Sequence, residues 1–241
     1  MIAAARDAGT VAAAPLVVSV ILNTNRRDDT LECLRSLAAT TYRSHVALVL
    51  DNASTDGSVE AIRAEFPDVR IHRLEQNLGY AGNNNVGIEQ ALALGADWVF
   101  VLNEDTVLAR DCLERLVEAG QQDERVGIVG PMVYHHLEPR VIQSAGGALS
   151  RDWSSFHLGQ NALDEGQFPS PHQVDWISGC AILVRRAVIE RVGTFDARYF
   201  YFWEETEWCL RASRAGWRVL HVPGAHLWHK GVSETTGRSR S

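Results

Sequence analysis

The stretch Val99-Phe100-Val101-Leu102-Asn103-Glu104-Asp105-Thr106 is an apolar run that ends abruptly in polar residues, two of them adjacent acids. Open α/β sheets bind ligands in the crevice beyond the carboxyl ends of their strands, so a buried strand here would place these acids where a ligand binds. Paired carboxylates suit Mg²⁺ or Mn²⁺, which complete their shells with phosphate and water. The alternative is a solvated turn whose acids cap a helix that begins near Ala109.

The residues before this run predict alternating strands and helices. Strands are expected at 16–22, 46–50 and 69–74, and helices at 28–37, 59–65 and 88–94. Leu31, Leu34 and Leu37 form one apolar stripe of the first helix. This alternation predicts βαβα connections and a mostly parallel sheet with helices on both faces, an α/β fold.

After residue 110 the pattern changes. A helix at 111–119, strands at 126–134, 174–184 and 217–222, and a helix at 186–192 are expected. Residues 135–173 show no period but carry aromatic side chains. Long irregular segments inside compact domains are usually binding loops or disordered, and the aromatics favour a binding loop.

Three of the expected strands in the first half end in polar residues that can meet at one crevice. Thr24 and Asn25 follow the first strand, Asp51 and Asn52 follow the second, and a Gly/Asn-rich loop at 76–87 follows the third. In a doubly wound sheet such a crevice commonly takes a nucleotide. No G-x-G-x-x-G follows the first strand and no G-x-x-x-x-G-K-[ST] occurs, which disfavours dinucleotide enzymes and P-loop ATPases.

The stretch 195–211 embeds acids among aromatic residues at the start of another expected helix. Carboxylates packed among aromatic rings lose water, which raises their pKa and suits a general base. The alternative is that Glu204 or Glu205 caps the helix with Arg211 as an ion-pair partner. His229 lies further on, after the last expected strand, and a single histidine is weak support for a metal site.

Composition bounds the protein class. The 241 residues carry a net charge of −7 and a hydrophobic fraction of 46%, typical of a globular α/β domain, and neither nucleic acid nor an anionic membrane is favoured as a partner. No apolar run approaches the ~20 residues of a membrane span. We expect a loose arm at 1–14 rather than a signal peptide, and a polar tail at 232–241. The four cysteines form no C-x-x-C pair and are expected to be buried thiols, which fits a cytoplasmic protein.

Seven stretches carry a family resemblance. In order they are VVSVILNTNRRDDTLECLRSL, VLDNASTDGS, NLGYAGNNNVGI, VFVLNEDTVL, ISGCAILVRRAVIERVGTFD, YFYFWEETEWCLRASRAGWRV and HLWHKG. Together they resemble the inverting GT-A-type family 2 glycosyltransferases, in the rhamnosyltransferase-like branch, over about residues 16 to 231. The resemblance implies a single GT-A (nucleotide-diphospho-sugar transferase) domain at 15–231, with a nucleotide-sugar-binding half at 15–108 and an acceptor and catalytic half at 109–231.

The resemblance also implies a role for each matching residue. Those expected to contact the nucleotide sugar are Thr24, Asn25, Asp51, Asn52, Asn77, Gly79, Asn83, Asn103 and Glu104. Asp105 is the expected metal ligand, with His229 able to reach the metal and diphosphate. Glu205 holds the position of the catalytic base and Glu204 lies beside it. Two residues depart from the family pattern, because Asn103 and Glu205 both stand where aspartate is usual.

The implied reaction is a metal-dependent transfer, with inversion, of rhamnose or another hexose from a nucleoside-diphosphate donor to an acceptor hydroxyl. The donor is a dTDP-, UDP- or GDP-sugar, the acceptor is a glycan or a small molecule, and the cation is Mg²⁺ or Mn²⁺. The enzyme would work in the cytoplasm or at the inner face of the membrane. We expect 135–173 to border the acceptor side and to be mobile until donor binds. The two rival classes are a sugar-nucleotide-binding module that has lost its chemistry and a nucleotidyltransferase.

Overall fold

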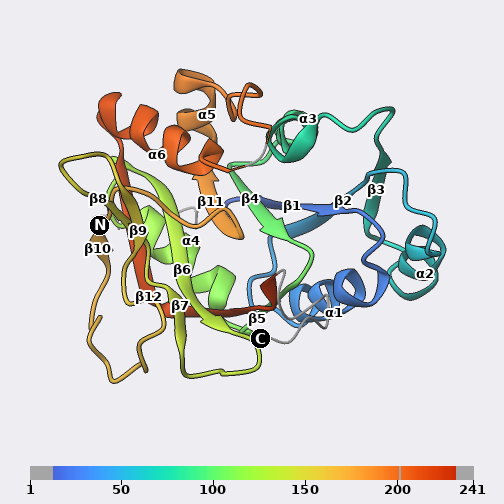
Figure 1. Ribbon diagram of the computed structural model, residues 1–241. Helices are drawn as coiled ribbons and strands as arrows, with labels where there is room; N and C mark the ends of the chain where they lie inside the picture. Colours follow the sequence, from blue (N-terminus) through green and yellow to red (C-terminus); the bar gives the residue numbers. More distant parts are fainter. Residues whose placement is uncertain (1–12, 201, 232–241) are drawn as a thin grey trace, which may run out of the picture.

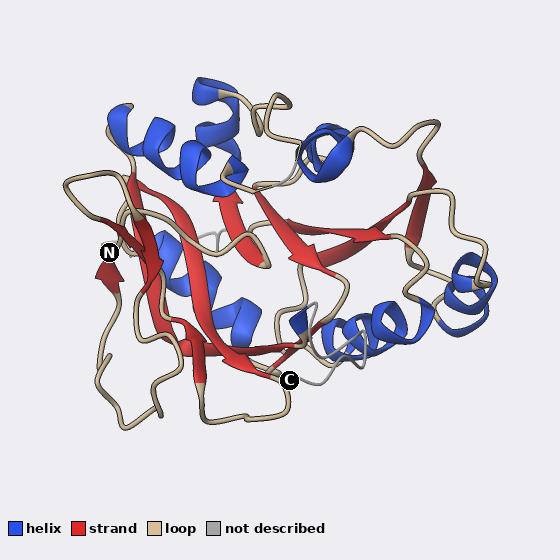
Figure 2. Cartoon of the chain, in the orientation of Figure 1, coloured by secondary structure: helices blue, strands red, loops and turns tan. Residues whose placement is uncertain are grey.

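The computed structural model describes residues 13–200 and 202–231 of the chain. The expected polar tail, and the expected N-terminal arm apart from its last two residues, lie outside this described part. A large mixed sheet runs through the molecule, and helices cover both of its faces (Figures 1 and 2). In the described residues its strand order is β10-β12-β6-β11-β4-β1-β2-β3.

The first half of the chain forms the parallel part of this sheet. Its elements are β1 (Val17–Asn23), α1 (Arg27–Ala38), β2 (His45–Asp51), α2 (Ser58–Glu65), β3 (Arg70–Arg73), α3 (Gly79–Ala93) and β4 (Trp98–Asn103). β1 lies between β2 and β4, parallel to both, and β3 continues the parallel run beyond β2. The register sets Asn23 beside Asp51 and Leu22 beside Asn103, so the carboxyl ends of three strands meet at one edge.

The second half extends the sheet with reversed pairings. Its elements are β5 (Thr106–Leu108), α4 (Cys112–Gln121), β6 (Val126–His135), β7 (Ile142–Ser144), β8 (Gly147–Leu149), β9 (Ser155–His157), β10 (His172–Gln173), β11 (Ala181–Arg185), α5 (Arg186–Val192), α6 (Glu204–Arg214) and β12 (Arg218–His229). β11 is antiparallel to both β4 and β6, whereas β6 and β12 are parallel to each other. The end of β12 pairs with β5, which brings His229 beside Thr106.

Each face of the sheet has its own apolar core. On one face α1, α2 and α4 contribute buried residues such as Leu34, Ile62 and Leu116. On the other face α3, α5 and α6 contribute Ile88, Val188 and Trp208. Figure 2 shows the two helix layers on opposite sides of the strands. This confirms the predicted α/β fold with helices on both faces.

Several predicted boundaries were wrong. Helix α3 begins at Gly79 instead of residue 88, so most of the predicted Gly/Asn loop is helical. Of the strand predicted at 174–184 only β11, from Ala181, is formed, and the last strand continues to His229 instead of ending at residue 222. Asparagine and glycine are poor helix formers, and tertiary contacts outweigh that preference in α3.

Two further expectations concern residue environment. All four cysteines are buried free thiols, as predicted. Within the described residues, no helix combines the length and the apolar character that crossing a membrane requires. The aperiodic stretch 135–173 contains the short strands β7 to β10, and the antiparallel pair β8–β9 forms a separate small sheet.

Candidate active site

A pocket of about 180 Å³ opens at the carboxyl edge of β1 and β4. The residues that line it come from both halves of the chain; they are Leu22, Thr24, Arg26, Tyr80, Asn103, Glu104, Asp105, His229 and Gly231. Of the residues predicted to form the site, Thr24, the three residues of the acidic strand end and His229 are brought together here. The site lies where the topology of an open α/β sheet places ligands.

Asp105 and His229 face each other across this pocket. Asp105 Oδ1 lies 3.1 Å from His229 Nε2, and both side chains are largely buried. Burial by itself raises the pKa of the Asp105 carboxyl, but the hydrogen bond and charge of His229 outweigh it, and the pKa is lowered. Asp105 is therefore an anion at neutral pH.

Gln143 orients His229 from the other side. Gln143 Oε1 lies 2.6 Å from His229 Nδ1, and an amide oxygen can only accept, so Nδ1 carries the proton. Nε2 faces Asp105 Oδ1, so it is the ring nitrogen that would contact a cation held by Asp105. A histidine that binds a metal usually donates its other ring N–H to a polar acceptor, as His229 Nδ1 does to Gln143 Oε1.

The donor set fits a divalent cation that shares its shell with a substrate. Carboxylate, water and phosphate oxygens suit Mg²⁺ and Mn²⁺, and an imidazole nitrogen is a common further metal ligand. The described residues hold no group of three or more histidine, cysteine, aspartate or glutamate side chains able to bind a metal by themselves. Asp105 and His229 would thus hold a cation whose remaining ligands come from phosphate oxygens and water.

Glu104 contributes a second carboxyl to the pocket. Burial, and next the charge of Asp105, raise the pKa of Glu104 to about 7. Arg26 lines the same pocket and pairs with Asp29 at 3.2 Å, so it brings positive charge beside the two acids. Such a mixed lining suits a ligand that carries both phosphate and hydroxyl groups.

Tyr80 joins the acidic strand end to the loop before β11. Its hydroxyl oxygen lies 3.0 Å from Asn103 Oδ1 and 2.8 Å from the carbonyl oxygen of Gly179. The Tyr80 proton is therefore shared between two acceptors, and Asn103 is oriented from one side. Asn103, which stands where aspartate is usual in the family, thus faces a hydroxyl donor.

The other residues predicted to contact the nucleotide sugar do not line this pocket. Asn25 Oδ1 accepts from the N–H of Thr55, and Asn52 Nδ2 donates to Thr24 Oγ1, so the loops after β1 and β2 are tied together. Asp51 is buried, 3.3 Å from Asn23 Nδ2. These contacts make a firm rim on the β2 side of the pocket.

The remaining three lie at the start of α3, which contains Gly79 and Asn83, and in the turn before it, which contains Asn77. Asn83 Oδ1 accepts from the N–H of Leu78, its Nδ2 donates to Asn77 Oδ1, and Asn77 Oδ1 also accepts from the N–H of Gly79. Gly79 has φ +77°, and a Cβ there would lie 2.6 Å from the ring of Phe200. The first residue of α3 therefore contacts the loop that leads into α6.

Glu204 and Glu205 begin α6. Glu204 is 4% exposed, and its Oε2 has no hydrogen-bond partner among the described residues. Burial, and next the charge of Glu204, raise the pKa of Glu205 to about 7. The predicted alternative in which Arg211 pairs with one of these acids is wrong, because Arg211 binds Glu207 at 2.8 Å.

Glu205 does not line the pocket but lies beside Gly179, in the loop before β11. A Cβ on Gly179 would lie 3.6 Å from Glu205 Cγ, and the Gly179 carbonyl oxygen accepts from Tyr80. A short path of contacts thus connects Glu205 to the pocket through Gly179 and Tyr80. A partly buried carboxyl with a pKa near 7 can accept a proton at neutral pH.

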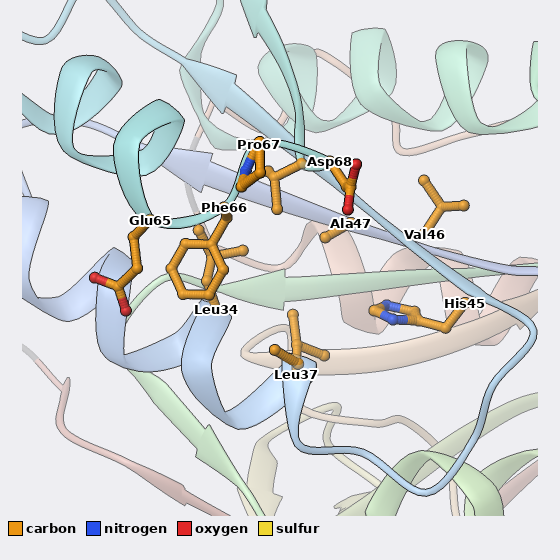
Figure 3. A pocket seen from close by; sticks show the side chains of 11 residues that line it. Leu34, Leu37, His45, Val46, Ala47, Glu65, Phe66, Pro67 and Asp68 are labelled. Carbon is orange, nitrogen blue, oxygen red and sulfur yellow. The ribbon is translucent and has the colours of Figure 1, made fainter.

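A larger hollow lies elsewhere. About 380 Å³ in volume, it is lined by residues of α1, of β2 and of the connection from α2 to β3, including Leu37, His45 and Phe66 (Figure 3). His45 begins β2, so this hollow is toward the amino end of the strand, away from the acids. It contains none of the predicted site residues.

Three residues of the site, Tyr80, Gln143 and Arg26, were not predicted from the sequence. Arg26 lies in the motif VVSVILNTNRRDDTLECLRSL and Tyr80 in NLGYAGNNNVGI, so their place beside predicted site residues could have indicated them. Gln143 lies in the aperiodic stretch, and no spacing or motif marks it. Its contact with His229 joins residues 86 positions apart, which only the folded chain reveals.

Comparisons with known proteins identify the family and the fold. The family model described as "Glycosyl transferase family 2" matches residues 19–193. An N-acetylglucosaminyl-diphospho-decaprenol L-rhamnosyltransferase of Mycobacterium tuberculosis is 32% identical over 223 residues, covering 85% of this chain and 72% of that protein. The dTDP-rhamnosyl transferase RfbF of Shigella flexneri is 27% identical over 192 residues, covering 76% of this chain and 58% of that protein.

Among solved structures, a mannosyltransferase from Pyrobaculum calidifontis in complex with GDP-Man and Mn²⁺ has the same fold. Its TM-score is 0.67 at 20% identity, and the match covers 91% of this chain but 58% of that one. This similarity confirms the predicted GT-A architecture. The family model and the mycobacterial relative each span most of the chain, and the chain therefore belongs to glycosyl transferase family 2 and is a glycosyltransferase of the hexosyl type.

Proposed function

We propose that this chain transfers a rhamnosyl or related hexosyl group from a nucleoside-diphosphate donor to an acceptor hydroxyl, with inversion at the anomeric carbon. One observation carries the proposal. Asp105 and His229 line the pocket together with Tyr80, and Tyr80 donates to Gly179, which lies beside Glu205. A group able to hold a cation and a group able to accept a proton thus flank one site. The mycobacterial and Shigella relatives are named as rhamnosyltransferases, which supports rhamnose as the sugar.

The donor half would use the edge of the parallel strands. Thr24, Asn25, Asp51 and Asn52 form the rim that would take the nucleoside, with Asn77, Gly79 and Asn83 on its other side. Asn103 and Glu104 would contact the sugar and diphosphate inside the pocket, near Arg26. We assign residues 15–108 to donor binding and 109–231 to the acceptor and to catalysis.

Asp105 and His229 would hold Mg²⁺ or Mn²⁺. When bound, the cation acts as a Lewis acid that neutralises charge on the diphosphate oxygens. Gln143 keeps the proton on Nδ1 of His229, which leaves Nε2 available as a ligand. Asp105, which lies 3.1 Å from Nε2, would be the anionic ligand beside it.

Glu205 would accept the proton of the acceptor hydroxyl. The acceptor oxygen then forms a bond to the anomeric carbon while the bond from that carbon to the diphosphate oxygen breaks, and the electron pair leaves with the nucleoside diphosphate. Attack from the face opposite the leaving group inverts the configuration. Glu204, buried beside the base, would raise its proton affinity through its own charge.

The acceptor would approach over the loop before α6. Tyr199, Phe200, Phe202 and Trp203 are large exposed aromatic residues next to Glu204. Exposed apolar groups gathered beside a site usually mark a binding surface. The name of the mycobacterial relative describes an N-acetylglucosaminyl-diphospho-decaprenol acceptor, and an acceptor with a sugar ring and an apolar part would suit this loop.

A panel of dTDP-, UDP- and GDP-sugars tests the proposal. We expect one donor to raise the melting temperature more in the presence of Mn²⁺ than without it, and slow release of the nucleoside diphosphate from that donor. Release of pyrophosphate would indicate a nucleotidyltransferase instead. Donor binding with no release or transfer to any hydroxyl acceptor would leave only a sugar-nucleotide-binding module.

A further inference from the structure

Asn85 lies within α3, and its side chain holds the backbone of Phe195, 110 positions away in the sequence. Asn85 Nδ2 donates to the Phe195 carbonyl oxygen at 2.8 Å, and the Phe195 N–H donates to Asn85 Oδ1 at 3.0 Å. A backbone N–H only donates and a carbonyl only accepts, so these contacts establish which amide atom is oxygen and which is nitrogen. The side chain thus forms a two-point clamp on one residue.

The clamped residue supports α6. The ring of Phe195 lies 4.4 Å from that of Trp208 and 6.3 Å from that of Tyr80, measured between centroids. Trp208 is fully buried on α6, and its Nε1 donates to the Gly193 carbonyl oxygen at 2.8 Å. Because the interior is close-packed, a shift of Phe195 is transmitted to Trp208 and to the first turn of α6.

A second contact ties α3 to the same loop. The N–H of Tyr80 donates to the Phe200 carbonyl oxygen at 2.9 Å, and the Phe200 ring packs on Gly79 where a Cβ would not fit. The loop between α5 and α6 is therefore held by α3 at Phe195 and again at Phe200. Figure 1 shows α3 beside α5 and this loop, on the same face of the sheet.

Asn85 has no local reason to be asparagine. In a helix interior asparagine is less favourable than alanine. The hydrogen bonds of the Asn85 side chain join it to Phe195, outside its own helix. It does not line the pocket of Asp105 and His229, so direct contact with the donor there is not its role. What remains is its effect on the position of the loop and of α6.

We propose that Asn85 is a positioning residue for Glu205, because its clamp on Phe195 sets where the first turn of α6 lies relative to the donor pocket. The inference rests on the proposed role of Glu205 as the base. The same helix begins with Gly79 and Asn83, which are proposed to lie along the nucleotide. α3 would therefore fix the position of the donor-binding residues relative to Glu205.

The test compares Asn85→Ala and Asn85→Asp with Gln90→Ala. Gln90 is a half-buried amide on the same helix whose side chain contacts His72 and not the loop, which makes it a matched control. We expect kcat to fall ~10-fold or more in both Asn85 variants, since small misplacements of a reacting group have large effects on rate. Donor affinity by calorimetry should stay unchanged, and Gln90→Ala should keep the wild-type kcat.

The pH profile separates positioning from a general loss of structure. With the clamp gone, water reaches Glu205 more easily and its pKa falls toward the ordinary value, so the acid limb of kcat moves to lower pH. A variant that only lost folded protein would keep the wild-type limb at a reduced amplitude, and this result would overturn the proposal. If Asn85→Ala does not fold, Asn85→Asp decides, since it retains an acceptor for the Phe195 N–H.

Glu205→Gln distinguishes failure of this inference from failure of the proposed function. Full kcat in Glu205→Gln would remove the base assignment and the clamp proposal with it. A crippled Glu205→Gln together with wild-type kcat in both Asn85 variants would overturn the clamp alone. In the Glu205→Gln background, adding Asn85→Ala should cause no further loss of kcat, whereas a full additional loss would show that Asn85 acts by another route.

Discussion

The acid limb of the pH–rate profile should belong to Glu205. Burial, followed by the charge of Glu204, raises the pKa of Glu205 to about 7, and the base works only when ionised. At pH 6 about one tenth of the enzyme would carry the ionised base and at pH 8 about nine tenths. We therefore expect kcat to rise roughly tenfold between these pH values.

Two substitutions test the origin of this limb. Glu205→Gln keeps size and hydrogen bonding but cannot accept the proton, so kcat should fall by ~10²-fold or more and lose the limb. Glu204→Gln removes the neighbouring charge, so the limb should move to lower pH while kcat at pH 8 changes little. Glu205→Asp restores the usual family residue but shortens the reach, and we expect it to be less active than the wild type.

Glu104 is the necessary control, because its pKa is also raised to about 7. Burial and Asp105 cause that shift, and Glu204 is not among its causes. Glu104→Gln should therefore leave the acid limb of kcat in place. Steady-state rates with saturating donor from pH 5.5 to 9 are the assay. Full activity in Glu205→Gln, or an unmoved limb in Glu204→Gln with a lost limb in Glu104→Gln, would refute the assignment.

Three further outcomes are expected. Asp105→Ala should abolish Mn²⁺-dependent donor binding in calorimetry while the melting temperature stays near the wild type, and unchanged Mn²⁺-dependent affinity would contradict the ligand assignment. Gln143→Leu should weaken Mn²⁺ binding ~10–100-fold because the His229 tautomer is no longer held, and wild-type affinity would argue against that role. His221 is buried, and burial followed by the charge of His172 lowers its pKa to about 3. As pH falls below about 6.5, this histidine therefore takes up a proton in the unfolded chain before it does so in the folded protein, which destabilises the fold. Between pH 7 and pH 5 the His221→Phe variant should lose about 2 kcal/mol less of its free energy of unfolding than the wild type does, as measured by urea unfolding, and equal losses in the two proteins would contradict this role.

The predicted behaviour of residues 135–173 also remains open to experiment. Donor with Mn²⁺ is expected to slow proteolysis of this stretch, since it contains Gln143, which contacts His229. Equal cleavage with and without donor would contradict the prediction that this stretch becomes ordered when donor binds.

The parallel half of the sheet was predictable because its signals are local. A fully buried strand needs a continuous apolar run, and the run at 99–102 and the acids after it are adjacent in the sequence. The same holds for Glu204 and Glu205, whose aromatic neighbours predicted their burial. Helix α3 was predicted too short because asparagine and glycine argue against a helix locally, and the contacts that favour the helix involve Phe195 and Phe200, far along the chain.

By itself the sequence determined the α/β class, the order of the motifs and the residue types at the strand ends, since each depends on neighbours within a few positions. Only the tertiary structure decided that β11 runs antiparallel beside β4, that Gln143 holds His229, and that Asn85 clamps Phe195. These contacts join residues tens of positions apart. Their formation depends on how strands pair and helices pack, which no local pattern encodes.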